Sequence, residues 1–118
     1  MVLTPLVFAL RNSLRGLRLA AASERAVRQE LAALVVAIPA ATLLAANAWQ
    51  WAALVGVILL VLAVELLNTA IEKLADHVTP EWNAAVGAVK DLGSAAVFAA
   101  LLLAGVVWAA ACLEVLAP

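Results

Sequence analysis

Three polar side chains recur on one face of an apolar stretch in the second half of this 118-residue chain. Glu65, Asn68 and Glu72 are spaced by three and four residues, so a helix would place them on one face. Glu65 follows thirteen residues that are all apolar or glycine, which indicates a position at or below a membrane surface. An ionisable group at that depth is energetically costly and is a functional-site hypothesis by default. The alternative interpretation is an end-of-helix acid that pairs with Lys73 or with an arginine.

Two carboxylates on one helix face can divide the work of a group transfer. One can bind a hard cation such as Mg²⁺, which takes one or two carboxylates together with substrate phosphates. The other can accept a proton from a hydroxyl group. Glu24 precedes the first long apolar run and is a candidate metal ligand from a second segment. Lys90, followed by Asp91, opens the last apolar run, where an ammonium group and helix-opening amides suit a phosphate.

The elements that position these residues must be membrane helices. Hydrophobic residues make up 68% of the chain and charged residues 13%, against about 45–50% and about 25% in soluble domains. This composition excludes a soluble monomer. About 20 helical residues cross a bilayer, so the length allows three crossings. We therefore predict an all-α membrane protein that forms a single membrane domain over residues 1–118.

Apolar runs and breaks divide the chain into four predicted helices. In the first, Arg11, Arg15 and Arg18 share one face, which is typical of an amphipathic helix lying in the membrane interface. A stop-transfer flank without a defined pose is the alternative for that segment. Thr79-Pro80 is the predicted break within a polar segment. The predicted bounds are 5–23 for the surface helix, 28–48, 51–75 and 91–116 for the three transmembrane helices, and 76–90 for a cytoplasmic loop.

The distribution of basic residues predicts the topology. All seven Lys and Arg residues lie before residue 31 or between residues 73 and 90. The positive-inside rule then places the N-terminus and the 76–90 loop in the cytoplasm, and the C-terminus outside. The chain has a single cysteine, Cys112, so it offers neither an internal disulfide nor a CxxC metal motif.

Four blocks of sequence carry a resemblance to a known family. They follow one another in the family's order and at its spacing, and Lys90 comes 18 residues after Glu72. Over residues 11–112 the chain resembles the small prokaryotic integral-membrane diacylglycerol kinases. The blocks are RGLR at 15–18, ERAVRQE at 24–30, ELLNTAIE at 65–72 and KDLGSAAV at 90–97.

The resemblance implies a bacterial inner-membrane enzyme that phosphorylates the hydroxyl group of diacylglycerol with MgATP. It also implies a homotrimer whose active sites, shared between neighbouring subunits, lie at the cytoplasmic edge of the bilayer. Membrane lipid, ATP and other copies of the chain are then its partners, and nucleic acid is not one.

The family's site residues map onto this sequence by position. Glu65 would be the general base on the lipid hydroxyl, and Glu24 and Glu72 would hold the magnesium ion. Asn83 stands where the best-known members of the family have a histidine. The implied nucleotide contacts are Glu24, Asn68, Glu72, Glu81, Trp82, Asn83, Lys90 and Asp91. The implied lipid contacts are Arg28, Glu30, Glu65, Ser94 and Trp108.

Two rival functions use the same residues. An undecaprenol kinase would keep the mechanism and change the lipid, although the Gly93-Ser94-Ala-Ala run is more similar to the diacylglycerol enzymes. A small ion-conducting subunit would also place acids within the membrane. Such a conductor needs no Lys90-Asp91 block, and it would place its acids near the middle of the bilayer.

Overall fold

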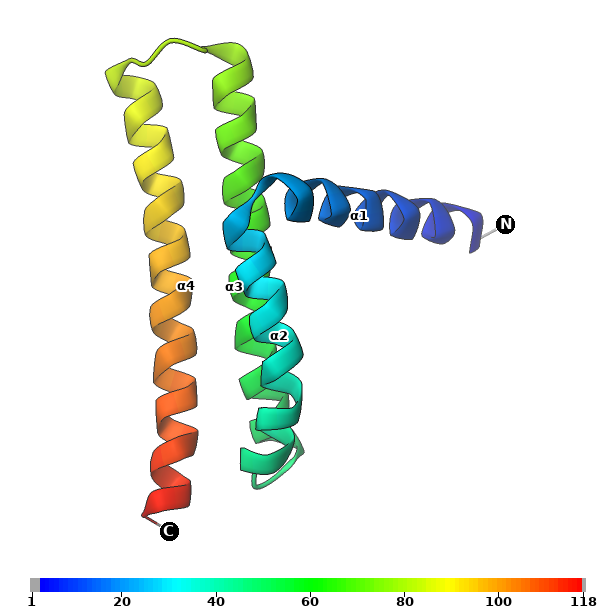
Figure 1. Ribbon diagram of the computed structural model, residues 1–118, viewed down its shortest axis with the longest axis vertical. Helices are drawn as coiled ribbons and strands as arrows, with labels where there is room; N and C mark the ends of the chain where they lie inside the picture. The colour runs from blue at the N-terminus through cyan, green and yellow to red at the C-terminus, as the bar shows by residue number, and fades with distance from the viewer. Residues whose placement is uncertain (1–2, 118) are drawn as a thin grey trace.

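The computed structural model describes residues 3–117, which form four α-helices. They are α1 (Leu3–Ser23), α2 (Arg25–Leu44), α3 (Ala48–Val78) and α4 (Ala84–Leu116). Helices α2, α3 and α4 run side by side, and α1 leaves the upper end of α2 at a steep angle (Figure 1). Three helices, α2, α3 and α4, are long and apolar enough to cross a membrane. The predicted all-α membrane architecture is confirmed in these respects.

Asparagine side chains fix where the two long helices begin. The Oδ1 atom of Asn47 accepts a hydrogen bond from the amide of Gln50 at 2.9 Å, and that of Asn83 accepts one from Val86 at 2.9 Å. Each bond satisfies an N–H group that has no partner inside its helix. Helix α3 therefore starts at Ala48, and α4 starts at Ala84.

The helical segments differ from the bounds expected from the sequence, most of all between α3 and α4. The expected loop over 76–90 is helical except for Thr79–Asn83. The polar composition of that stretch arises because both helices continue beyond their apolar parts. An ion pair of 2.7 Å between Lys90 Nζ and Asp76 Oδ1 joins the two extensions. Helix α2 covers Arg25–Leu44 where 28–48 was expected.

Helix lengths place the polar residues relative to a bilayer. Helix α2 has 20 residues, α3 has 31 and α4 has 33. At 1.5 Å per residue these lengths are about 30, 46 and 50 Å, against a hydrocarbon core of about 30 Å. Measured along α3 from Ala48, Glu65 lies at about 26 Å and Glu72 at about 36 Å. Glu65 is therefore at one edge of the apolar layer, and Glu72 is beyond it.

Helix α3 is the centre of the packing. At the end of the bundle next to α1, Leu62 of α3 packs with Val27 of α2. On the side of α3 that faces α4, Val61 contacts Ala100 and Ala104, two alanines four residues apart. Small side chains at this spacing let membrane helices approach closely. Because α3 touches both neighbours, its side chains are fixed by packing from two sides.

Helix α1 joins α2 through a single residue, Glu24, whose backbone is extended. The guanidinium group of Arg28 donates hydrogen bonds to the carbonyl oxygens of Ala21, at 2.8 Å, and Ala22, at 3.4 Å. A cation that caps the last carbonyls of a helix is stabilising. This contact fixes the bend between α1 and α2, and it places Glu24 beside α3.

Candidate active site

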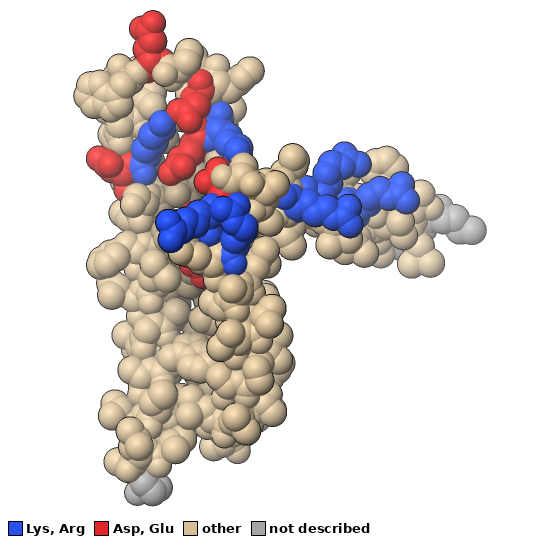
Figure 2. All heavy atoms as spheres, in the orientation of Figure 1, with Lys and Arg blue, Asp and Glu red and all other residues tan. Residues whose placement is uncertain are grey.

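Four carboxylates gather where α2 meets α3. Glu65 is 9% exposed, and its carboxyl group interacts electrostatically with those of Glu30, Glu72 and Glu24. Figure 2 shows the charged side chains concentrated at this end and along α1, while the lower part of the visible face is uncharged. The predicted base therefore lies within electrostatic range of both predicted metal ligands of the same chain.

Asn68 holds one of these carboxylates in place. Its Nδ2 atom donates a hydrogen bond to Glu72 Oε1 at 3.2 Å. Asn68 and Thr69 are both buried between the helices. Because the donor comes from a fixed residue, one oxygen of Glu72 is oriented by the fold. The three side chains predicted to share a face of α3 therefore interact with one another: Asn68 bonds to Glu72, and Glu65 interacts electrostatically with Glu72.

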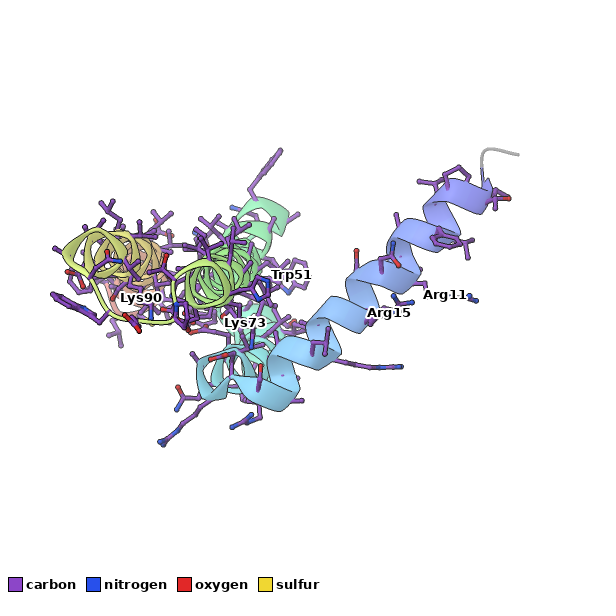
Figure 3. All side chains as sticks on the ribbon, turned by 90° about the horizontal axis from the view of Figure 1, so that it is seen from above. Arg11, Arg15, Trp51, Lys73 and Lys90 are labelled. Atoms are coloured by element: carbon purple, nitrogen blue, oxygen red, sulfur yellow. The ribbon has the colours of Figure 1, made fainter. Side chains whose placement is uncertain are left out.

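The two lysines near this cluster take different partners. Lys73 Nζ lies 3.6 Å from Glu24 Oε1, and both side chains are partly exposed. An exposed pair of this kind contributes about 0–1 kcal/mol. The sequence left open a pairing of Lys73 with an acid of its own helix, and the structure pairs it with Glu24 of the α1–α2 junction instead. Figure 3 shows Lys73 and Lys90 at the bundle, away from Arg11 and Arg15 on α1.

A cavity of about 430 Å³ opens between α1 and α3. Its wall is mostly apolar and includes Leu17 and Ala20 of α1 together with Leu66 and Ala70 of α3. Lys73 lies at the same cavity, and so does Thr69, the neighbour of Asn68 in the sequence. The cavity therefore lies beside the ion pair of Lys73 with Glu24.

The remaining predicted nucleotide contacts lie at the 79–83 loop and the start of α4. Glu81, Trp82 and Asn83 are exposed, and the side chain of Trp82 is near Gly87. Lys90 is half-buried and bound to Asp76, and Asp91 is exposed. These residues share the end of the bundle that carries the carboxylates, since α3 and α4 both extend there.

The predicted lipid contacts are dispersed. Glu30 lies beside Glu65, whereas Arg28 caps α1 and Ser94 is exposed on α4. Trp108 donates from Nε1 to the carbonyl oxygen of Leu54 at 3.1 Å. Leu54 precedes Glu65 by about 16 Å along α3. Within one chain, Trp108 therefore packs in the other half of the bundle, away from the carboxylates.

The capping role of Asn83 gives a testable prediction. We expect Asn83→Ala to lower the free energy of unfolding by about 1 kcal/mol, because α4 loses its side-chain cap. Asn83→Ser keeps a capping oxygen and should restore most of the stability. Thermal unfolding in one detergent, followed by circular dichroism, measures the difference. Equal melting temperatures for Asn83→Ala and the wild type would contradict the cap.

The KM for ATP of the capped Asn83→Ser variant separates stability from binding. A nucleotide contact through the amide of Asn83 predicts that this variant is stable and has a raised KM. An unchanged KM would leave Asn83 with its capping role alone.

The residues present fit a magnesium ion. Within residues 3–117 no group of three or more His, Cys, Asp or Glu side chains forms a metal cage. Mg²⁺ seldom uses such a cage and is held by one or two carboxylates plus phosphate oxygens. Glu24 and Glu72 can supply those carboxylates, and the amide of Asn68 orients one oxygen of Glu72.

These features define a helical membrane protein with a carboxylate centre at one edge of its apolar layer. Comparison with known proteins is consistent with that class. Residues 11–112 match the prokaryotic diacylglycerol kinase family. The chain belongs to this family and is therefore a lipid kinase, an enzyme that uses ATP. Family membership excludes the ion-conducting subunit considered from the sequence.

Three relatives show how far the similarity extends, and each is named diacylglycerol kinase. The Pseudomonas aeruginosa protein is 44% identical over 82% of this chain and 79% of its own. The Haemophilus influenzae protein is 38% identical over 90% of both chains. The Escherichia coli K12 protein is 38% identical over 89% of this chain and 86% of its own.

Proposed function

We propose that the protein transfers the γ-phosphoryl group of MgATP to the hydroxyl group of diacylglycerol, giving phosphatidic acid and ADP. The observation that carries this proposal is the burial of Glu65 beside Glu24 and Glu72 at the edge of the apolar layer. A lipid hydroxyl group stays at that depth, and ATP reaches it from the aqueous side. The names of the relatives support diacylglycerol as the lipid.

In the proposed reaction, the lipid hydroxyl oxygen attacks the γ-phosphorus atom and the bond to the ADP oxygen breaks. The hydroxyl proton passes to the carboxylate of Glu65. Phosphoryl transfer depends mainly on positioning and on neutralising charge. Glu24 and Glu72 would hold Mg²⁺, which supplies part of that neutralisation. Lys90 would bind phosphate oxygens by exchanging its contact with Asp76 for the nucleotide.

The lipid chains would lie in the apolar cavity between α1 and α3. This cavity reaches Thr69, one residue from Asn68, so a lipid placed there would have its head group near the carboxylates. Helix α1 would lie in the membrane interface as an amphipathic surface helix, with Arg11, Arg15 and Arg18 toward the phosphate layer. The steep angle between α1 and the bundle supports this pose (Figure 1).

The same arguments support a position in the bacterial inner membrane. The N-terminus and the 79–83 loop would face the cytoplasm, and the C-terminus would face outward. The basic residues all lie on α1, at the start of α2 and at the carboxylate end of α3 and α4, which agrees with the positive-inside rule.

We propose that three copies assemble and that α4 of one subunit completes the site of its neighbour. Large apolar side chains on α2, such as Val35 at 71% and Leu43 at 88% exposure, leave a surface for lipid or another subunit. The carboxylates come from the α1–α2 junction, α2 and α3 of one chain, whereas Lys90 and Asp91 come from α4. A neighbouring α4 could therefore bring a lysine to each cluster.

Mixing two inactive variants tests this assembly. Glu65→Gln and Lys90→Met, combined in equal amounts, should recover up to about a quarter of wild-type activity in a cyclic trimer with shared sites. Recovery is expected because some sites then combine an intact Glu65 with a neighbour's intact Lys90. Phosphorylation is measured after refolding the mixture, with each variant alone as a control. No recovery in confirmed mixed trimers would indicate that each site belongs to one chain.

A radiolabelled-ATP assay in mixed micelles tests the function. Purified protein is offered diacylglycerol and undecaprenol in parallel, with and without Mg²⁺. We expect label in diacylglycerol that depends on Mg²⁺. Label in undecaprenol alone would keep the mechanism and replace the lipid. No label in either lipid, from folded protein, would overturn the proposal.

A further inference from the structure

Gly93 of α4 lies directly against the side-chain amide of Asn68 in α3. A Cβ atom built on Gly93 would come within 2.0 Å of Asn68 Oδ1 and 3.2 Å of its Cγ. Separations under 3.0 Å are essentially never seen for real Cβ atoms. Any residue larger than glycine would therefore force Asn68, or the whole contact between α3 and α4, to move.

The Oδ1 atom of Asn68 is buried and has no conventional hydrogen-bond donor among residues 3–117. Its neighbour on this side is the Cα–H group of Gly93. Contacts from Cα–H groups to oxygen atoms recur where helices pack closely, and they are weakly favourable. Gly93 thus gives the oxygen both the space and the partial positive charge that it needs.

The two ends of the Asn68 side-chain amide therefore have different neighbours. The Nδ2 end donates to Glu72 Oε1 at 3.2 Å, while the Oδ1 end faces Gly93. A reversed amide would turn its oxygen toward the carboxylate of Glu72, which is electrostatically unfavourable. The contact with α4 consequently decides which end of Asn68 meets Glu72.

We propose that Gly93 is a positioning residue for Glu72 and that it acts through the amide of Asn68. The chain Gly93–Asn68–Glu72 holds the Glu72 carboxylate in the orientation that binds the divalent cation. The inference rests on the proposed function, because it requires that Glu72 binds the metal ion. Groups that orient a metal ligand typically change metal affinity by about 10–100-fold when removed.

The same helix contains a matched control. Gly105, also in α4, has nothing within 4 Å of its Cβ position, so Gly105→Ala adds the same methyl group into open space. Both substitutions raise helix propensity equally. A difference between the two variants therefore reports the contact with Asn68.

The experiment measures binding of Mn²⁺, used as a paramagnetic probe for Mg²⁺, to the full-length protein in lipid nanodiscs with a non-hydrolysable ATP analogue. Free Mn²⁺ is followed by electron paramagnetic resonance. We expect Gly93→Ala to weaken Mn²⁺ binding by about 10-fold or more, and Gly105→Ala to stay within about twofold of the wild type. Equal affinities for the two variants would overturn the inference.

A double variant tests whether the effect passes through Asn68. Asn68→Ala alone should weaken Mn²⁺ binding by about 10-fold. Adding Gly93→Ala should cause no further loss, because alanine at 68 leaves room for the new methyl group. Losses that multiply in the double variant would overturn the route through Asn68.

Two further outcomes keep the test decisive. If Gly93→Ala does not fold, Asn68→Ala carries the test, and wild-type Mn²⁺ affinity in that folded variant would overturn the inference. Failure of the wild type to phosphorylate any lipid would instead overturn the proposed function. An active wild type, with Gly93→Ala and Gly105→Ala binding Mn²⁺ alike, would remove the inference and leave the function standing.

Discussion

Replacing Glu65 with glutamine is expected to slow lipid phosphorylation by about 10²–10⁴-fold, the usual contribution of a general base. Glutamine has nearly the same shape as glutamate, but its amide cannot accept the hydroxyl proton. Glu65 is 9% exposed at the edge of the apolar layer. A neutral amide is less costly to bury there than a carboxylate, so the melting temperature should not fall. Initial rates with radiolabelled ATP and thermal unfolding in the same detergent measure the two quantities.

Glu114→Gln is the matched control for this prediction. Glu114 lies near the opposite end of α4, is exposed and contacts Gln50 of α3. The same change of charge at that site should leave the rate within about twofold of the wild type. A near-normal rate for Glu65→Gln would remove Glu65 as the base. Equal losses in both variants would point to a general disturbance of the bundle.

Replacing Glu72 with glutamine is expected to raise the Mg²⁺ concentration needed for half-maximal activity by at least about tenfold. The substitution removes the charge of a carboxylate that would hold Mg²⁺ and that Asn68 orients through a hydrogen bond of 3.2 Å. Glu24→Gln should act in the same direction, because Glu24 would supply the second carboxylate. The measurement is a Mg²⁺ titration of the initial rate at fixed ATP concentration.

Asp76→Asn is a stringent control for the magnesium prediction. Asp76 lies one helical turn beyond Glu72, and its partner is Lys90 at 2.7 Å. The Asp76→Asn substitution removes the same charge as Glu72→Gln. Its titration curve should therefore keep the wild-type midpoint. Coincident curves for Glu72→Gln and Asp76→Asn would show that general electrostatics, and not ligation, sets the Mg²⁺ requirement.

Hydropathy and spacing were sufficient to predict the three apolar helices and the shared face of Glu65, Asn68 and Glu72. Both signals are local, because helix periodicity depends on neighbours three and four residues apart. The extent of the 76–90 loop could not be predicted from polarity alone. Polar residues also form the solvent-facing ends of long helices, and the cap at Asn83 decides where α4 begins.

Contacts between helices could not be predicted in the same way. The sequence shows Gly93 and Asn68 in separate motifs, and their contact depends on the rotation and register of α4 against α3. Spacing also does not indicate that Arg28, an implied lipid contact, binds the last carbonyl oxygens of α1. Likewise, spacing does not indicate that the indole N–H of Trp108, another implied lipid contact, bonds to the backbone of Leu54.

The single-residue junction at Glu24 makes the rotational phase of α1 depend on the length of the chain at that point. An α-helix turns by about 100° per residue. One helical residue added to the end of α1 at this junction would rotate the arginine face of α1 by about that angle relative to the bundle. It would also turn the α1 wall of the cavity away from α3. The number of residues at the junction therefore sets both the rotation of α1 and the position of Glu24 beside Lys73 of α3.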